Sequence, residues 1–378
     1  MLIKKRIFIS IDWFTPGFRA GGPIKSIVNF CEAFKNEFEI FIYTSDRDLG
    51  TAQPYPVKVN SWVVNNGVNV FYSSPPNQNR ANLKKQLASV APNFIYINSI
   101  FSKHYSIDVL LIQKHFPKIK YIVAPRGMLK QSALNFKKAK KVIFLKVANI
   151  FSLYKNIVFQ ATDEVEAADI QKQIQSYNAV TQIGNLPQKP QKSITYLPKA
   201  EHFLRIIFVG RIHPIKNLKL ALQSVNCKNC NIHFTIVGLL EDKEYWEQCN
   251  EEIKNFGSNI TVNYLAEVEP LELQKIVANN HILFLPTQGE NFGHAIYESL
   301  CTGRPAVISD QTPWQNLEAQ QAGFDVALKD EQKFKNCIEF FANMNQQKYN
   351  VWCDGAHNLA NNYYNHSDTK TKYLTLFN

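Results

Sequence analysis

Two glutamates stand close together in the stretch Pro286–Pro305, which reads PTQGENFGHAIYESLCTGRP. The short apolar run His281–Leu285 before it is typical of a buried parallel strand, and the residues after Gly293 have the spacing of a helix. Glu290 therefore lies in a strand-to-helix loop, and Glu298 lies just over one turn into the helix. Such a junction binds phosphates, because unpaired helix N–H groups point at the anion. Taken alone, the pair fits a purely structural role equally well, in which Glu290 favours the helix dipole and Glu298 is solvated.

Two cations follow another predicted strand, Arg205–Val209, in the sequence GRIHPIKN. Gly210 frees the turn, and Arg211 and Lys216 stand at the carboxyl end of the sheet, ahead of a helix that begins near Asn217. The planar fork of an arginine and the point charge of a lysine can together bind a diphosphate. Their benefit would rise as a leaving nucleoside diphosphate gains negative charge. Taken alone, the loop fits two solvated cations equally well.

A glycine pair, Gly21-Gly22, ends the loop after the predicted strand Ile7–Ile11 and precedes Pro23, which suits a first helical turn. Glycines let the backbone approach a ligand closely, so a phosphate-sized site fits here, and so does a purely structural turn. The spacing is not that of the dinucleotide fingerprint, which argues against a nicotinamide or flavin enzyme.

The elements that must position these residues alternate between strand and helix, and this alternation predicts parallel sheets in an α/β fold. The stretch Pro187–Glu201 (PQKPQKSITYLPKAE) is typical of a linker. We therefore predict two doubly wound domains, residues 1–190 and residues 191–378, the second with a helical tail. The predicted strands are Ile7–Ile11, Glu39–Tyr43, Val68–Tyr72, Phe94–Ile97, Tyr121–Ala124 and Ile157–Gln160 in the first domain, and Arg205–Val209, Ile232–Val237, Ile260–Tyr264, His281–Leu285 and Ala306–Ile308 in the second.

The composition is that of a globular protein, with 45% hydrophobic and 12% aromatic residues in 378. The net charge of +11 implies an anionic partner such as a nucleotide, a nucleic acid or a membrane surface. The basic residues are scattered and no recognition motif accompanies them, so we do not expect nucleic-acid binding. Seven cysteines without regular spacing, and no cleavable signal, predict reduced thiols in a cytoplasmic protein.

One basic segment allows two interpretations. Lys137, Lys138, Lys140 and Lys141 precede the apolar run VIFLKVANIFSLY. The segment fits an interfacial helix whose lysines face anionic headgroups, which would make the protein peripheral at the inner face of the cytoplasmic membrane. It equally fits a core helix with a solvated lysine cap.

The motifs together resemble family 4 of the retaining nucleotide-sugar glycosyltransferases. GRIHPIKN and PTQGENFGHAIYESLCTGRPAVISD carry the likeness, since Glu290 and Glu298 fit the two-glutamate signature of that family. The Gly21-Gly22 loop matches the amino-terminal glycine loop of the family. Pro125–Leu129 (PRGML) and Thr312–Trp314 resemble a subgroup tied to bacterial surface polysaccharides. The resemblance implies the GT-B architecture, two facing Rossmann-like domains with an interdomain cleft.

The resemblance also implies roles for single residues. Arg211 and Lys216 would bind the donor diphosphate, Glu298 the two ribose hydroxyls, and Glu290 hydroxyls of the transferred sugar; one carboxylate has acceptor oxygens for two adjacent hydroxyls. We take Glu290, Arg211 and Lys216 as the catalytic residues. The other residues of the implied donor site are Gly21, Gly22, Gly210, Asn291, Phe292, Gly293 and His294.

The chain departs from the family pattern in its first domain. Many members carry a histidine at the end of a strand beside the donor sugar, whereas here the strand Phe94–Ile97 ends in Asn98-Ser99. The nearest imidazole, His104, is more simply explained as a satisfied surface or core histidine. Arg126 and Asn98 are the candidates for the acceptor side.

The implied function is a hexosyltransferase that uses a UDP- or GDP-sugar, acts with retention by a front-face displacement, and needs no metal and no cofactor. The acceptor would be a glycan or a lipid-linked molecule in surface polysaccharide biosynthesis, such as lipopolysaccharide or capsule. Closure about the Pro187–Glu201 linker would bring the domains together around the donor. The alternatives are a nucleotide-sugar epimerase of the same architecture and a non-catalytic nucleotide-sugar-binding scaffold.

Overall fold

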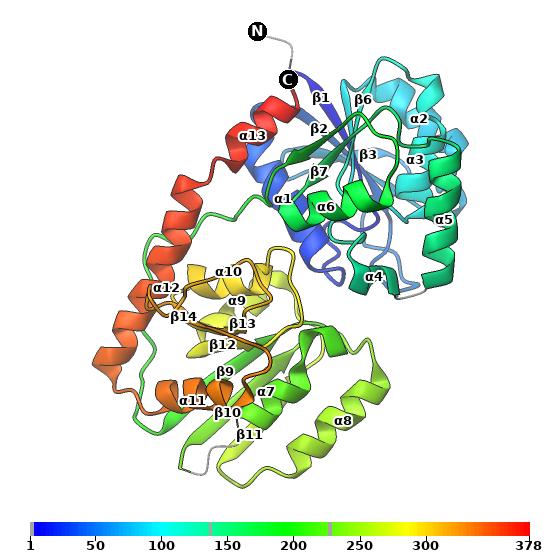
Figure 1. Cartoon of the computed structure of the whole chain (residues 1–378). Coiled ribbons are helices and arrows are strands. Elements are labelled where there is room, and N and C mark those ends of the chain that lie inside the picture. Colours follow the sequence, from blue (N-terminus) through cyan, green and yellow to red (C-terminus); the bar gives the residue numbers. More distant parts are fainter. Residues whose placement is uncertain (1–3, 136–137, 226–228) are drawn as a thin grey trace. The chain divides into compact units, whose positions relative to one another are not determined.

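The structure is a computed structural model that describes residues 4–135, 138–225 and 229–378 (Figure 1). The chain divides into two compact units, the first comprising Met1–Leu186 and Asp368–Asn378 and the second Pro187–Ser367. Each unit is built on one sheet whose order requires crossovers between parallel strands. The prediction of two doubly wound α/β domains is therefore confirmed. The sequence places residues 368–378 with the second domain, whereas in the structure they belong to the first unit.

The first sheet has eight strands in the order β3-β4-β2-β1-β5-β6-β7-β8, and β3 pairs antiparallel with β4. The prediction missed β3 and β8. An Asn66-Gly67 turn with positive φ at both residues joins β3 to β4, and this dipeptide is itself a hairpin signal. The strands are β1 Arg6–Ser10, β2 Glu39–Ser45, β3 Trp62–Asn65, β4 Val68–Ser73, β5 Phe94–Ile97, β6 Lys120–Val123, β7 Ile157–Ala161 and β8 Ala179–Gln182.

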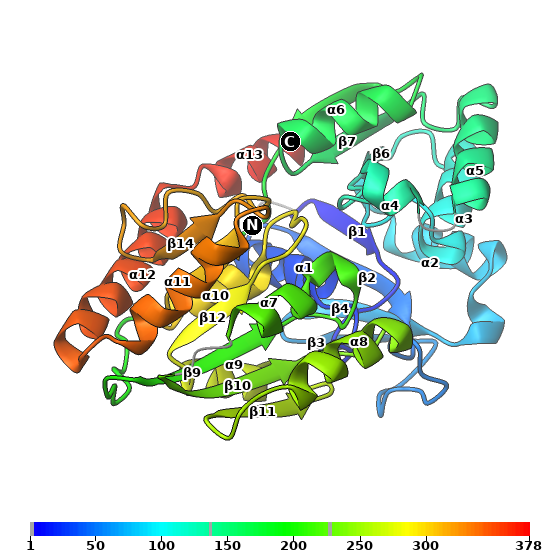
Figure 2. The same cartoon turned by 60° about the horizontal axis from the view of Figure 1, so that its bottom comes forward.

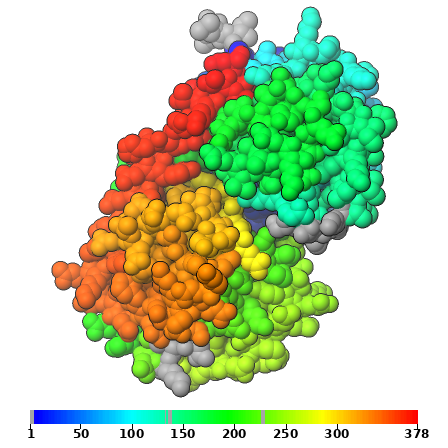
Figure 3. Space-filling view, in the orientation of Figure 1, coloured from blue at the N-terminus to red at the C-terminus, as the bar shows by residue number. Residues whose placement is uncertain are grey.

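The central strand β1 is buried on both faces, with Ile7, Phe8 and Ile9 fully inaccessible. Phe8 belongs to one apolar cluster, whereas its neighbours Ile7 and Ile9 belong to another. The strand therefore contributes side chains to an apolar core on each side of the sheet. The space-filling view shows the blue-green residues around α5 at the surface of this unit (Figure 3). Its helices are α1 Gly22–Phe34, α2 Arg80–Val90, α3 Asp108–Leu111, α4 Gln131–Asn135, α5 Lys138–Ile150, α6 Glu164–Gln173 and α13 Thr369–Leu376, with shorter turns η1 Pro75–Asn77, η2 Lys103–Ile107 and η3 Gln113–His115.

The tail returns to the first unit through aromatic packing. Tyr373 of α13 and Phe377 just after it lie against Phe30 of α1, with ring centroids 5.4 and 5.6 Å away. Phe377 also meets the edge of Phe94 at 5.3 Å, and Lys120 donates to the carbonyl of Leu376 at 2.7 Å. Burying these rings stabilises the tail on α1 and β5, because aromatic side chains bring large apolar areas out of water.

The second sheet has six strands in the order β11-β10-β9-β12-β13-β14, all parallel (Figure 2). Helix α7 packs on α8 and α11, whereas α10 packs on α9 and α12, which gives two helix layers. The strands are β9 Phe203–Val209, β10 Asn231–Val237, β11 Ile260–Leu265, β12 Ile282–Leu285, β13 Ala306–Ser309 and β14 Gly323–Val326; the helices are α7 Leu218–Ser224, α8 Lys243–Lys254, α9 Pro270–Ala278, α10 His294–Cys301, α11 Glu331–Ala342 and α12 Gln346–His366, with η4 Pro214–Lys216.

The predicted linker, Pro187–Glu201, is an extended segment that belongs to the second unit, and we call it the strap. Lys199 is buried and donates to the carbonyls of Ala342, the last residue of α11, and of Met344, just past it, both at 2.9 Å. A buried cation at a helix C-terminus satisfies carbonyls that have no intrahelical partner. The Arg304 guanidinium donates to the carbonyl of Thr195 at 2.6 Å. The polar composition predicted a linker, but it could not show that Thr195 and Lys199 find partners within the second unit.

Candidate active site

The structure brings Lys216 and Glu290 into contact, with the Nζ and Oε1 atoms 2.5 Å apart. Their side chains are only 18% and 12% exposed. Lys216 follows β9 and Glu290 follows β12, and these two strands are parallel neighbours. The carboxyl ends of parallel neighbours meet at one edge of the sheet, so the pairing follows from the topology. The pair is enclosed enough for its charges to interact strongly.

The two loops that carry the pair are tied together by their backbones. The carbonyl of Ile215 accepts from the N–H of Gln288 at 2.7 Å and from the hydroxyl of Thr287 at 3.0 Å. The N–H of Glu290 donates to the carbonyl of Gln311, in the loop after β13, at 3.1 Å. These bonds fix the loops after β9, β12 and β13 to one another. They thereby hold the side chains of Lys216 and Glu290 in contact.

Arg211 points to the other side of β9. Its Nη1 atom bonds the Glu241 carboxylate, which lies in the loop after β10, and the Arg211 side chain is 46% exposed. The N–H of Ile212 donates to the carbonyl of Leu239 at 2.9 Å and fastens the two loops. Sequence reasoning missed Glu241, because its place just after a strand does not show that this strand adjoins β9. Each cation of GRIHPIKN therefore has its own carboxylate.

Two glycines allow this close arrangement. A Cβ on Gly210 would lie 3.3 Å from Cγ of Lys216, so the lysine stem crosses directly over this residue. A Cβ on Gly238, at the end of β10, would lie 1.9 Å from the carbonyl oxygen of Gly210. No side chain fits at Gly238, which the sequence analysis did not single out.

The turn Asn291–His294 leads into α10, and Gly293 caps the helix with φ 78°. A Cβ on Gly293 would approach Cδ1 of Ile296 to 2.9 Å. The carbonyl of Phe292 accepts from the indole N–H of Trp314 at 2.6 Å, and both rings are buried. The turn is therefore fixed to the loop after β13, and the first N–H groups of α10 lie at the carboxyl edge of the sheet, where a helix start can bind an anion.

Glu298 lies on α10 and is buried, at 8% exposure. Burial raises the pKa of the neighbouring Cys301 thiol to about 12, and the Glu298 carboxylate contributes to that shift. Helix α10 belongs to the α9–α12 layer, whereas Lys216 leads into α7 of the opposite layer. Glu290 and Glu298 therefore lie on different elements: Glu290 is in the loop after β12, and Glu298 is in helix α10.

Arg126 and Asn98 lie together in the first unit. The guanidinium of Arg126 donates to the Asn98 amide oxygen at 2.8 and 3.1 Å, to the Asn185 oxygen at 2.5 Å and to the Tyr96 hydroxyl at 2.7 Å. The next residue, Gly127, donates its N–H to the buried Glu166 carboxylate. These bonds join the ends of β5 and β6 to the segment after β8, and an acceptor-side role for Arg126 and Asn98 stays a prediction.

The other predicted residues of the first unit lie in the segments that follow β1 and β5. Gly21 has φ 64° and ψ −116°, a conformation that only glycine adopts readily, and it begins α1. His104 contacts the Asp108 carboxylate at 3.1 Å, as expected for a satisfied histidine. Sequence reasoning missed Asp12, whose carboxylate accepts from Ser102 and whose pKa is raised by burial. A lone acid after a strand gives no pattern that could have identified it.

Residues 191–357 match the family described as Glycosyl transferases group 1. The match lies within the second unit and includes Arg211, Lys216, Glu290 and Glu298. No curated protein matches the chain.

Several solved structures share the fold over nearly the whole chain. Sucrose-phosphate synthase from Thermosynechococcus elongatus has a TM-score of 0.72 at 13% identity, over 99% of this chain and 98% of that one. Anabaena HepE, solved with UDP and glucose, has a TM-score of 0.66 at 13% identity, over 98% of each chain. WaaG, a glycosyltransferase involved in lipopolysaccharide biosynthesis, has a TM-score of 0.61 at 12% identity, again over 98% of each chain. The predicted GT-B architecture is therefore confirmed at the level of the fold.

Proposed function

We propose that this chain, whose second unit contains a group 1 glycosyltransferase domain, transfers a hexose from a UDP- or GDP-sugar to a glycan or lipid-linked acceptor in bacterial surface polysaccharide biosynthesis. The observation that carries the proposal is the enclosed Lys216–Glu290 pair at the sheet edge of that domain. A cation and a carboxylate held in contact there can bind the phosphate and the hydroxyl groups of one nucleotide sugar.

We assign each of these residues to a different part of the nucleotide sugar. Glu290 holds hydroxyls of the transferred sugar, and Lys216, with three N–H donors, can keep its bond to Glu290 while donating another to a phosphate oxygen. Arg211 has five donors, so it can turn its free N–H groups to the diphosphate without leaving Glu241. Glu298 accepts from the ribose hydroxyls, and the start of α10 provides N–H groups for the phosphate.

The proposed reaction retains the configuration of the anomeric carbon. The bond from that carbon to the diphosphate oxygen breaks, a bond to the acceptor oxygen forms on the same face, and the acceptor proton passes to the departing diphosphate. Lys216 and Arg211 stabilise the charge that develops on the leaving group, in the place where other enzymes use a divalent ion. Glu290 fixes the sugar, so positioning supplies much of the rate enhancement.

A membrane-proximal acceptor agrees with the surface of α5. Leu145 and Ala148 are buried in the first unit, whereas the opposite side of the helix and the residue after it carry an exposed apolar stripe. The stripe consists of Ile143 (62% exposed), Val147 (45%), Ile150 (76%) and Phe151 (77%). This supports the interfacial interpretation over the core helix. Among the described residues, no helix combines the length and apolar character needed to cross a bilayer.

Lysines occur on α5 beside this stripe and in the segment that follows it. Lys140, Lys146 and Lys155 are exposed, and Lys141 donates to the carbonyl of Ala133 at 2.7 Å. Lys137 lies outside the described residues. Apolar side chains flanked by cations suit the interface of an anionic bilayer. We therefore propose peripheral association with the inner face of the cytoplasmic membrane.

A thermal-shift screen with UDP, GDP, ADP and their sugars tests the proposed function. A nucleotide present at 100 times its Kd should stabilise the protein by about 2.7 kcal/mol, which raises the melting temperature measurably. We expect a UDP or GDP compound to give the largest shift. If none of these compounds moves the transition, the nucleotide-sugar assignment is wrong.

A product analysis then separates transfer from the alternatives. With the nucleotide sugar that stabilises the protein most, NMR of the reaction mixture should show a nucleoside diphosphate and, with the correct acceptor, a new glycosidic linkage. An epimerase would instead accumulate an epimer of the sugar without an acceptor, and a scaffold would leave the nucleotide sugar intact.

A further inference from the structure

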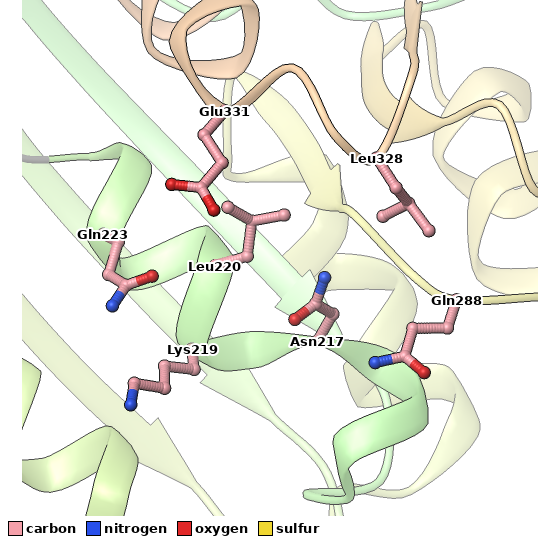
Figure 4. A pocket seen from close by; sticks show the side chains of 7 residues that line it. All are labelled: Asn217, Lys219, Leu220, Gln223, Gln288, Leu328 and Glu331. Carbon is pink, nitrogen blue, oxygen red and sulfur yellow. The ribbon is translucent and has the colours of Figure 1, made fainter.

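A cavity opens in the second unit near the Lys216–Glu290 pair. It has a volume of about 500 Å³ and lies between the start of α7 and the start of α11 (Figure 4). Asn217 and Leu220 line it from α7, Gln288 from the loop after β12, and Leu328 and Glu331 from the segment that leads into α11. Its size is that of an ordinary small-molecule site.

The cavity adjoins the Lys216–Glu290 pair but is separate from Glu298. Asn217 follows Lys216 directly in the chain, and the N–H of Gln288 is bonded to the carbonyl of Ile215 in the same turn. Helices α7 and α11 form one layer, whereas Glu298 lies on α10 in the other. A molecule in the cavity would therefore lie nearer to Glu290 than to Glu298. Under the proposed roles of these two residues, it would lie next to the transferred sugar rather than next to the ribose.

The lining offers hydrogen-bonding groups that the described part of the chain does not use. The side chains of Asn217, Gln288 and Glu331 make no hydrogen bond or ion pair within residues 4–135, 138–225 and 229–378. Asn217 has φ 58°, in the left-handed region, and this backbone conformation fixes the direction of its Cα–Cβ bond. Figure 4 shows Leu220 in the middle of the lining, with Asn217 and Gln288 on one side.

The single cation of the lining already has an acidic neighbour. Nζ of Lys219 lies 3.8 Å from the Glu252 carboxylate of α8, and the Gln223 amide donates to the same carboxylate at 2.8 Å. An anion would thus meet Glu331 without a free cation to balance it. A neutral ligand rich in hydroxyls fits better, because planar amides and a carboxylate can each bond adjacent hydroxyls. Leu328, which is half-buried, provides an apolar surface for the C–H face of a pyranose ring, and Leu220 packs beneath the lining.

We propose that this cavity is a glycan subsite, which binds one neutral pyranose residue of the acceptor beside the transferred sugar. The inference rests on the proposed function for its place in the reaction. The binding itself depends only on the cavity, so the two can be tested apart.

Saturation-transfer NMR with methyl glycosides tests the binding. The probes are the methyl α- and β-pyranosides of glucose, galactose, mannose and N-acetylglucosamine. The test variant is Asn217→Gly combined with Gln288→Ala; glycine suits φ 58°, so the turn is preserved. The control is Gln332→Ala, the same kind of truncation at an exposed residue of α11 that does not line the cavity.

At least one glycoside should receive saturation from the wild-type protein and from the control, and the double variant should bind it about tenfold more weakly, as expected for two lost hydrogen bonds. Calorimetry should give unchanged UDP or GDP affinity for all three proteins. If no glycoside binds, or if the double variant binds as the wild type does, the subsite is wrong. Glycoside binding without any nucleotide binding would instead support the cavity and reject the proposed donor function.

Discussion

At the scale of single residues, the two cations of GRIHPIKN are not equivalent. Lys216 is 18% exposed and paired with a mostly buried carboxylate, whereas Arg211 is 46% exposed and paired with Glu241, itself 35% exposed. An interaction in an enclosed site is less weakened by water than one at the surface. Lys216 should therefore contribute more to diphosphate binding than Arg211.

Calorimetry with UDP and GDP measures this difference. Lys216→Met, which keeps the aliphatic stem over Gly210, should weaken nucleotide binding by about 2 to 5 kcal/mol. Arg211→Ala should weaken it by only about 1 kcal/mol, as for an exposed charged contact. Equal losses, or a larger loss for Arg211→Ala, would contradict the assigned roles.

The glycine after β10 makes a second residue-scale prediction. Gly238→Ala would place a Cβ 1.9 Å from the carbonyl oxygen of Gly210, so the backbone that supports Lys216 must shift. Urea unfolding should show a loss of about 1 to 3 kcal/mol or more, the usual result of overpacking. The control Gly289→Ala has open space around the new Cβ and should leave stability nearly unchanged. Similar unfolding midpoints for both variants would refute the steric account.

At the scale of elements, a buried histidine links β9, β12 and the strap. Nδ1 of His281 accepts from the N–H of Arg205 at 2.9 Å, so the neutral ring carries its proton on Nε2, which donates to the carbonyl of Pro198 at 3.1 Å. Burial lowers the pKa of His281 from 6.5 to about 4. The folded protein therefore binds fewer protons than the unfolded chain between these values, and stability rises with pH there.

The second unit should lose about 3 kcal/mol of stability from this group as the pH falls from about 6.5 to about 4. Urea unfolding of the wild type and of His281→Gln at about pH 7 and about pH 4.5 measures it; glutamine can accept and donate but does not titrate. The variant should show a shallower pH dependence. The same slope in both proteins would show that His281 does not titrate on unfolding.

The apolar stripe beside the lysines of α5 makes the other element-scale prediction. The wild type should sediment with phosphatidylglycerol vesicles and poorly with phosphatidylcholine vesicles. Ile150→Glu combined with Phe151→Glu should weaken binding by about tenfold or more, because two large apolar side chains no longer enter the interface. Val64→Glu, at a residue 76% exposed on β3, is the matched control and should bind normally. Binding that survives the double variant would exclude this surface.

At the scale of the whole molecule, the sequence predicted what alternation and spacing can encode. The two parallel sheets were predicted from the alternation of strands and helices. Lys216 and Glu290 were each expected just after the carboxyl end of a strand. Their contact agrees with that expectation, because β9 and β12 are neighbours in the sheet. The pairing of Arg211 with Glu241 was not predicted, because it depends on which strand adjoins β9 on its other side. Strand order is a long-range property that one sequence does not state.

The course of the tail shows the same limit. The spacing of Tyr373 and Phe377 indicates an apolar helix face, but it does not say which unit that face covers. Likewise, Pro187–Glu201 has the composition of a linker, yet Lys199 and Thr195 bind groups of the second unit. The chain therefore passes between the two units at Leu186–Pro187 and again at Ser367–Asp368.

The most direct test of the Lys216–Glu290 assignment is turnover by Glu290→Gln, measured as nucleoside diphosphate released from the nucleotide sugar that stabilises the protein most. Glutamine keeps the size and the hydrogen-bonding reach but removes the charge, so the fold and the nucleotide affinity should persist. The assignment predicts a fall in turnover of about 100-fold or more, as when a preorganised transition-state contact is lost. Near-normal turnover by the folded variant would contradict it.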